Sequence, residues 1–311
     1  MSNSKRSGEA VRNRNAQTPP PAPEALRVAV ADSHTHMDMQ TPGVDEIIAA
    51  AAAVGVTPLI QVGVDVASSR WAAEIAERHA SVWAAVALHP NEAPRIVHGD
   101  GAPGVEADDT DWAGKHRPAG GARALDEAVD EIDRLAALPQ VRAVGETGLD
   151  YFRTGSEGAS AQAESFRRHI DIAKRHGIGV MIHDRDAHDD VLRILEEEGA
   201  PETVIFHCFS GDAEMAKICA EHGYFMSFAG NVTFASAQPL RDAAAVAPAE
   251  LILVETDAPF LTPKPYRGRP NAPYLIPHTL RAIAEAKGMA EDDLAAAVAG
   301  NAERAFGLRS P

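Results

Sequence analysis

Hydrophobic residues along the chain gather in short runs, and most of these runs are followed by a longer segment with apolar residues at helical spacing. Short apolar runs rich in β-branched residues are typical of buried strands, and apolar residues three or four positions apart are typical of helices with one buried face. The pattern predicts strands at residues 27–31, 57–63, 82–88, 141–146, 179–182, 204–207, 223–228 and 251–255. It predicts helices at residues 43–54, 66–79, 123–137, 160–176, 186–198, 212–222 and 236–246, and a closing pair at 277–287 and 291–306.

Strands that alternate with helices indicate an α/β fold with a parallel sheet, and eight such units are the number that closes into a (β/α)8 TIM barrel. An open doubly wound sheet is the alternative. It is disfavoured because no glycine-rich phosphate-binding loop follows the first predicted strand. We therefore expect a single TIM-barrel domain over residues 25–311.

Two segments depart from this rhythm. Residues 1–24 are rich in serine, asparagine, arginine and proline, and we expect a disordered N-terminal leader. Residues 98–122 are rich in glycine, aspartate and proline, and we expect an extended surface loop between the third strand and its helix.

Composition narrows the class of protein. Of the 311 residues 45% are hydrophobic, which is enough for a large core, but no stretch is long and apolar enough to span a membrane. The start of the chain has no apolar signal-peptide segment, and Cys208 and Cys219 are the only cysteines, so we expect a cytoplasmic protein. The formal net charge of −16 argues against broad electrostatic binding to nucleic acid, which would need a local basic patch or bound cations.

The first predicted strand is followed by Asp32-Ser33-His34-Thr35-His36. Residues two apart in a strand point to the same side, so His34 and His36 can share one divalent metal ion. Such a pair is weak evidence alone. The ends of later strands add Glu146, His183, His207 and Asp257. Because catalytic groups of a TIM barrel come from the carboxyl ends of several strands, these six side chains predict a centre for one or two metal ions.

Other histidines give a different picture. His89 ends the third predicted strand, where it either faces the site as an anion contact or proton donor, or caps the strand. Most of the histidines in helical segments, His169 and His188 among them, are expected to be solvated. Cys208 follows His207 directly, so strand alternation is expected to turn its side chain away from the metals.

Several motifs together resemble the TatD family of metal-dependent hydrolases, in the right order and over about residues 27–306. They are Asp32-Ser33-His34-Thr35-His36-Met37-Asp38, Gly145-Glu146-Thr147-Gly148-Leu149-Asp150-Tyr151, Ile182-His183-Asp184-Arg185-Asp186-Ala187, His207-Cys208-Phe209-Ser210-Gly211, Glu255-Thr256-Asp257-Ala258-Pro259 and Leu261-Thr262-Pro263-Lys264-Pro265-Tyr266-Arg267-Gly268.

The resemblance implies an amidohydrolase-type TIM barrel and, in the best-known members, deoxyribonuclease activity that often runs 3′-to-5′ on single strands. It implies that His34 and His36 hold one metal and that Glu146 bridges to a second, held by His183 and His207. Asp257 would bind the first metal and, as general base, take a proton from a metal-activated water. The metal stays open among Mg, Mn and Zn, since imidazole-rich ligand sets suit Zn, Mn, Ni or Fe, whereas Mg prefers oxygen.

Three features depart from the family pattern. Asp184 stands where a serine commonly follows the histidine of the fifth strand, and His89-Pro90-Asn91 stands where a second histidine is usual. The third departure is the added loop and leader. No ligand is lost, so these features bear on the choice of substrate.

A DNA substrate, as single strands or ends, would need positive charge near the metals. Candidate substrate-binding residues are His89, Arg153, Arg185, Tyr266 and Arg267, with Tyr266 offering a face for base stacking. The same barrel could instead hydrolyse an ester or amide bond, for example in D-aminoacyl-tRNA or a small molecule, and the acidic charge favours that alternative. A metal-stabilised scaffold without activity is a third reading, and the presence of Asp257 argues against it.

Overall fold

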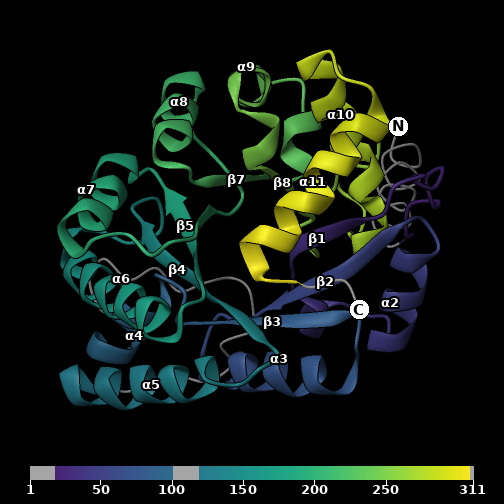
Figure 1. Cartoon of the computed structure of the whole chain (residues 1–311). Coiled ribbons are helices and arrows are strands. Elements are labelled where there is room, and N and C mark those ends of the chain that lie inside the picture. Colours follow the sequence, from purple (N-terminus) through teal and green to yellow (C-terminus); the bar gives the residue numbers. More distant parts are fainter. Residues whose placement is uncertain (1–17, 101–118, 309–311) are drawn as a thin grey trace, which may run out of the picture.

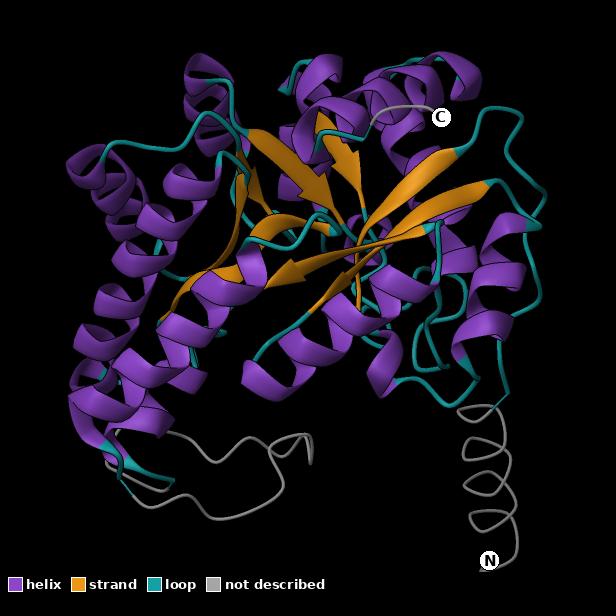
Figure 2. Cartoon of the chain, turned by 60° about the horizontal axis from the view of Figure 1, so that its bottom comes forward, coloured by secondary structure: helices purple, strands orange, loops and turns teal. Residues whose placement is uncertain are grey.

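A computed structural model describes residues 18–100 and 119–308. The described strands form one eight-stranded sheet in the order β1 to β8, and every neighbouring pair is parallel. A parallel bridge between Thr35 and Ala258 joins the first strand to the chain just after the last. Strands lie at the centre with helices around them, so the predicted (β/α)8 barrel is confirmed (Figures 1 and 2).

The strands lie close to the predicted ranges. They are β1 (Val30–Thr35), β2 (Val56–Val62), β3 (Val82–Val86), β4 (Val141–Asp150), β5 (Gly179–Arg185), β6 (Val204–Phe206), β7 (Phe225–Phe228) and β8 (Ile252–Val254). The first strand starts three residues later than predicted, so His34 lies within it. The fourth runs on to Asp150, and the fifth to Arg185. These two extended strands pair with each other up to Asp150 and Arg185, which carries their ends above the barrel.

The helices that follow the strands are α2 (Val44–Ala52), α3 (Val66–Arg78), α4 (Glu92–His98), α5 (Gly121–Ala136), α6 (Ser156–His176), α7 (His188–Glu198), α8 (Ala213–His222), α9 (Gln238–Val246), α10 (Ile276–Lys287) and α11 (Glu291–Phe306). The short helix α4 was not predicted. Of the predicted loop at 98–122, residues 101–118 lie outside the described residues. No helix in the described ranges is long and apolar enough to cross a membrane.

Two hydrophobic clusters hold the barrel together. The larger one lies between the strands and the helices. The smaller fills the barrel interior with side chains such as Ile60, Met181 and Leu253, and it continues into Phe306 and Leu308 at the end of α11. Alternate strand residues feed the two clusters, as expected for a parallel sheet that is buried on both faces. The polar side chains of the site gather at the carboxyl ends of the strands, as is general for this barrel.

Residues 18–24 differ from the expectation of a leader without contacts. The Arg269 side chain donates hydrogen bonds to the carbonyl oxygens of Thr18 and Pro19, and the Tyr274 hydroxyl donates to Pro20. Arg281 donates to the carbonyl of Glu24. Composition alone could not predict these contacts because they use backbone oxygens. Residues 1–17 lie outside the described residues.

Candidate metal centre

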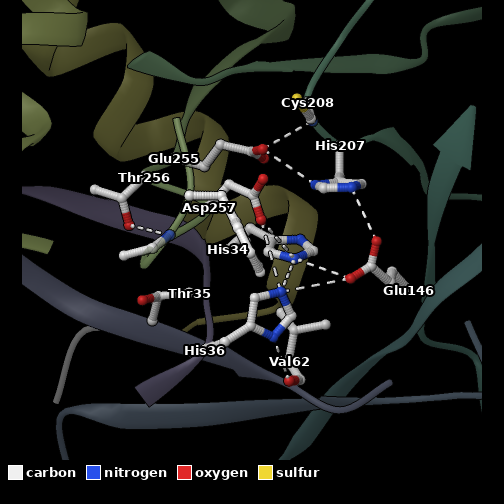
Figure 3. Close-up of polar contacts among 12 residues, drawn as sticks. His34, Thr35, His36, Val62, Glu146, His207, Cys208, Glu255, Thr256 and Asp257 are labelled. Carbon is white, nitrogen blue, oxygen red and sulfur yellow. Dashed lines mark hydrogen bonds and ion pairs between the residues drawn. The ribbon is translucent and has the colours of Figure 1, made fainter. Parts of the chain in front are cut away.

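The structure brings the six predicted ligand residues together at the carboxyl ends of the strands. Figure 3 shows five of them: His34, His36, Glu146, His207 and Asp257. The Nε2 atoms of His34 and His36 lie 3.1 Å apart, and both face Glu146 Oε1 at 3.4 and 3.5 Å. Asp257 Oδ1 lies 3.8 and 3.6 Å from the same two nitrogens. Four tetrahedral ligands at about 2.1 Å from a zinc-sized ion lie about 3.4 Å from one another. The spacing of the His34, His36 and Glu146 atoms therefore fits one metal ion, and Asp257 lies beside the two histidines of this group.

The closure of the barrel sets this first group. The Asp257 N–H donates to the carbonyl of His34, and the His36 N–H donates to the carbonyl of Ala258, each at 2.9 Å. These bonds join β1 to the segment that follows β8. The ends of the first and last strands therefore bring Asp257 beside two histidines that precede it by more than two hundred positions in the sequence.

A second group of donors surrounds the other oxygen of Glu146. His207 Nε2 lies 3.0 Å and His183 Nδ1 3.1 Å from Glu146 Oε2. Glu146 thus presents one oxygen to His34 and His36 and the other to His183 and His207. A carboxylate in this position can bridge two metal ions, and the predicted pairing of ligands is compatible with the observed contacts.

In each of the four histidines, the ring nitrogen that points away from Glu146 lies beside a hydrogen-bond acceptor. The other ring nitrogen, which faces Glu146, is therefore left for a metal ion. The acceptors are Met181 Sδ for His34 (3.1 Å), the Val62 carbonyl for His36 (3.0 Å), Asp150 Oδ2 for His183 (3.2 Å) and Glu255 Oε1 for His207 (3.1 Å). Asp150 and Glu255 lie inside the motifs that resemble the TatD family, but no role was predicted for them. In the sequence, each of these acidic residues only stands near a predicted ligand at a strand end. That position does not identify the histidine that the carboxylate contacts.

The electrostatics of the site favour a cation. Burial lowers the pKa of a histidine, but contacts with Asp257 and Glu146 outweigh it and raise the pKa of His36 to about 10. For His207 the charges of Glu146 and Glu255 likewise outweigh burial and raise the pKa well above its usual range. Protons are therefore held tightly where no metal is bound, and a divalent ion would replace them. The donor set, its spacing and its charge all fit a metal centre.

His89 behaves differently from the four candidate ligands. The Asn91 N–H donates to His89 Nδ1 at 3.1 Å, so that nitrogen carries a lone pair. Burial lowers the pKa of His89 to about 3, which keeps the ring neutral and its hydrogen on Nε2. That N–H lies 3.6 Å from Glu146 Oε2. His89 faces the site, and it presents a hydrogen-bond donor there rather than a lone pair.

A cavity of about 460 Å³ lies directly above these groups. Arg153 and Arg185 line it, as predicted, together with His89 and Asn91. Tyr266 and Arg267 do not line it. The Tyr266 ring packs edge-on against His278, and Arg267 lies over the ring of Phe234. Adjacency to the last strand suggested that both would reach the site, but the loop directs them to α10 and to the residues before α9.

Two expectations were wrong. Cys208 lines the cavity instead of turning away, because β6 ends at Phe206 and Cys208 adopts a φ of 43°, so strand alternation does not apply there. His169 is buried rather than solvated. Its Nε2 accepts a hydrogen bond from the Leu88 N–H and its Nδ1 contacts the Ser165 carbonyl, which compensate its polar atoms.

Comparisons with known proteins agree with this geometry. Residues 31–307 match the family described as TatD related DNase. The chain is 42% identical to an uncharacterized metal-dependent hydrolase TatD of Mycobacterium tuberculosis, over 90% of this chain and 98% of that protein. It is 32% identical to the 3'-5' ssDNA/RNA exonuclease TatD of Escherichia coli K12, over 85% and 93%. The crystal structure of YjjV, a TatD homologue from Escherichia coli K12, superposes with a TM-score of 0.75 at 26% identity, covering 90% of this chain and 98% of that one. The resemblance of the motifs is thereby confirmed, and the chain belongs to the TatD family of metal-dependent hydrolases.

Proposed function

We propose that this hydrolase cleaves phosphodiester bonds, as a nuclease that removes nucleotides from the 3′ ends of single-stranded DNA or RNA. The observation that carries the proposal is the arrangement of Asp257, His89 and the two arginines around one cavity. A relative at 32% identity is named a 3'-5' ssDNA/RNA exonuclease, which supports the same choice.

A bound divalent ion would lower the pKa of water and offset negative charge on a phosphoryl oxygen. His34, His36 and Asp257 would hold one ion, His183 and His207 a second, and Glu146 would touch both. The ion would be Mg, Mn or Zn. The donor set of imidazoles and carboxylates does not select one of the three.

Asp257 is suited to accept a proton. Burial raises the pKa of Asp257, but contact with His36 and the charges of His34 and His207 outweigh it and hold the pKa below its usual range. The carboxylate therefore stays ionised at neutral pH, and it lines the cavity floor. It can take the proton of a water molecule as that water attacks phosphorus.

The leaving oxygen needs a proton or a hydrogen bond as the P–O bond breaks. The Nε2–H of His89 lies in the same cavity and the ring is neutral, so it can donate a hydrogen bond to the leaving oxygen but keeps its proton. The leaving oxygen then takes its proton from solvent. Arg153 and Arg185 line the cavity wall above it and can bind the phosphates on either side of the cleaved bond.

An ester or amide hydrolase, acting on D-aminoacyl-tRNA or a small molecule, is the second candidate. The net charge of −16 favours it, because a long polyanion is repelled by the rest of the surface. In this case the same Asp257 would serve the same water, and only the bond presented to it would change.

The test is release of mononucleotides from a 3′-labelled single-stranded oligonucleotide with Mg, Mn or Zn, by the wild type and by Asp257→Asn. Asp45→Asn is the matched control, since the Asp45 side chain is 93% exposed and away from the cavity. Metal-dependent release that is lost only in Asp257→Asn supports the proposal. A wild-type protein that binds metal and hydrolyses esters or amides but releases no nucleotide would select the second candidate.

A further inference from the structure

Large hydrophobic side chains are exposed at a few positions of the described chain, and they are unevenly placed. Tyr151, Phe152 and Phe260 lie next to the strand ends that surround the cavity, whereas Ile218 and Val246 lie on the outer helices. Phe152 is the most exposed, at 59%, and Phe260 is 38% exposed. Aromatic rings left in water beside a catalytic cavity are typical of a surface that stacks on a ligand.

Phe260 forms one wall of the cavity. Its N–H donates to the carbonyl of Asp257 at 2.8 Å, so the ring is held one turn from the proposed general base. The edge of the ring faces His36, with the centroids 6.4 Å apart. Phe260 therefore has a fixed position relative to the proposed metal ligands while much of the side chain stays open to solvent.

Arg185 contributes a second wall, and the exposed ring of Phe152 packs against its guanidinium without itself lining the cavity. The Arg185 guanidinium lies 4.0 Å over the centre of the Phe152 ring, and Arg185 lines the cavity. No carboxylate lies within ion-pair distance of Arg185 in the described ranges, so its charge is available to an anion. Tyr151, the other exposed ring here, is turned outward and donates its hydroxyl hydrogen to Asp190.

The second wall is also fixed to the metal centre. Asp150 Oδ1 accepts the N–H of Phe152 at 3.0 Å, and Asp150 Oδ2 contacts His183. The Tyr151 N–H donates to the carbonyl of Arg185 at 2.9 Å. One carboxylate thus holds both the backbone of Phe152 and a proposed metal ligand, which ties the position of Phe152 to the metal centre.

The barrel topology places these walls on opposite sides of the cavity. Phe152 and Arg185 follow β4 and end β5, whereas Phe260 follows β8. In a closed ring of eight strands, β4 and β8 are as far apart as two strands can be. A chain that crosses the cavity from one wall to the other passes over Glu146 and Asp257 between them.

We propose that Phe260 and the Phe152–Arg185 pair are stacking platforms for two bases of single-stranded nucleic acid, one on each side of the bond to be cleaved. The inference rests on the proposed function and adds the residues that hold the bases of its single-stranded substrate. Stacking accepts any base because every base has a π-face, and Arg185 supplies charge for an adjacent phosphate. A duplex is excluded as a direct substrate because its base faces are covered by neighbouring bases.

The experiment compares Phe152→Leu and Phe260→Leu with the wild type. Leucine keeps an apolar side chain but removes the ring face, and both positions are exposed, so folding should be retained. Phe234→Leu is the matched control, since the ring of Phe234 also lies under an arginine, at 4.5 Å, but that arginine, Arg267, does not line the cavity, whereas Arg185 does. The readout is kcat/KM on a short single-stranded oligonucleotide divided by kcat/KM on bis(p-nitrophenyl) phosphate, which has no bases.

Each of the two cavity variants should lower this ratio about fivefold or more, mainly through KM for the oligonucleotide. The ratio should fall by the same factor with deoxyribose and ribose oligonucleotides. The oligonucleotide with the higher wild-type kcat/KM identifies DNA or RNA as the preferred substrate. Blunt duplex should be a poor substrate for every variant.

Two results separate the inference from the function on which it rests. If the wild type hydrolyses both substrates but neither cavity variant changes the ratio, or Phe234→Leu lowers it equally, the stacking platforms are wrong and the phosphodiesterase stands. Equal hydrolysis of blunt duplex and single strand would overturn the platforms as well. If the wild type hydrolyses neither substrate with any metal, the proposed function itself fails.

Discussion

Glu255 lies fully buried behind His207, and replacing it by glutamine removes a charge with almost no change in volume. Its Oε1 accepts the His207 Nδ1–H at 3.1 Å and the Cys208 N–H at 2.8 Å, while its Oε2 has no hydrogen-bond partner. The amide nitrogen of glutamine can occupy the place of Oε2, so Glu255→Gln breaks no existing bond. What changes is the strength with which His207 is held and polarised as a metal ligand.

The size of the effect follows from these contacts. A hydrogen bond to a charged group contributes about 1.5–3 kcal/mol and a neutral one about 0.5–1.5 kcal/mol, so neutralising Glu255 weakens the bond to His207 by about 1–1.5 kcal/mol. At about 1.4 kcal/mol per tenfold, this is a loss of about tenfold in metal affinity. It agrees with the range of about 10- to 100-fold for groups that orient a metal-binding histidine.

Metal affinity is measured by competition with a chromogenic chelator on metal-free protein, and folding by circular dichroism. Glu250→Gln is the control, since Glu250 is exposed and lies just before β8. Glu255→Ala should lose more, because His207 Nδ1–H and Cys208 N–H are then both unpaired, and it should also lower the stability of the metal-free protein. A folded Glu255→Gln protein with wild-type metal affinity would refute the role of Glu255 and, with it, the placement of His207 as a ligand.

Three further results are expected. Removing bound metal with a chelator should lower the melting temperature by about 10 °C. The reason is that a ligand at a thousand times its Kd adds about 4 kcal/mol to the stability of a domain of this size. An unchanged melting temperature would contradict a metal centre that forms only on folding. Gly148→Ala should destabilise the protein by at least about 2 kcal/mol in denaturant unfolding and weaken metal binding, because Gly148 has a φ of +132° and an added Cβ would lie 2.2 Å from the carbonyl oxygen of His183. Burial lowers the pKa of His169 to about 4, below the value of about 6.5 in an unfolded chain. The contribution of neutral His169 to the free energy of unfolding is therefore present above pH 6.5 and is lost as the pH falls toward 4. The full loss is about 3 kcal/mol. The difference between wild type and His169→Gln in urea unfolding should show that slope, and parallel pH profiles for the two proteins would exclude it.

The proposed ligands could be predicted because of a general property of parallel barrels. All strands point the same way, so the residue at each carboxyl end faces the same opening wherever it lies in the sequence. His34, Glu146 and Asp257 are far apart along the chain, yet locating their strands was enough to expect them together. Boundary errors of a few residues, as in β1 and β4, did not alter this result, because the ligands are set by where the strands end and by the two-residue period of the strand.

Contacts between side chains from different strands were not predictable in the same way. Nothing local indicates that Asp150 meets His183 or that Glu255 meets His207, since each pair depends on the distance between strand ends in space. The same holds for Cys208, whose positive φ belongs to the turn after β6 and ends the alternation on which its orientation was judged.

The sequence by itself determined the fold, the family and the residues that converge, because hydrophobic periodicity fixes the strands and the barrel brings their ends together. The tertiary structure alone decided how each group can act. It gave His89 a hydrogen on the nitrogen that faces the site. It left Phe260, rather than Tyr266, in the cavity wall, with the exposed ring of Phe152 against the cavity-lining Arg185. These properties depend on the hydrogen-bond partner of each atom and on the solvent exposure of each side chain. The pattern of hydrophobic and polar positions specifies neither of them.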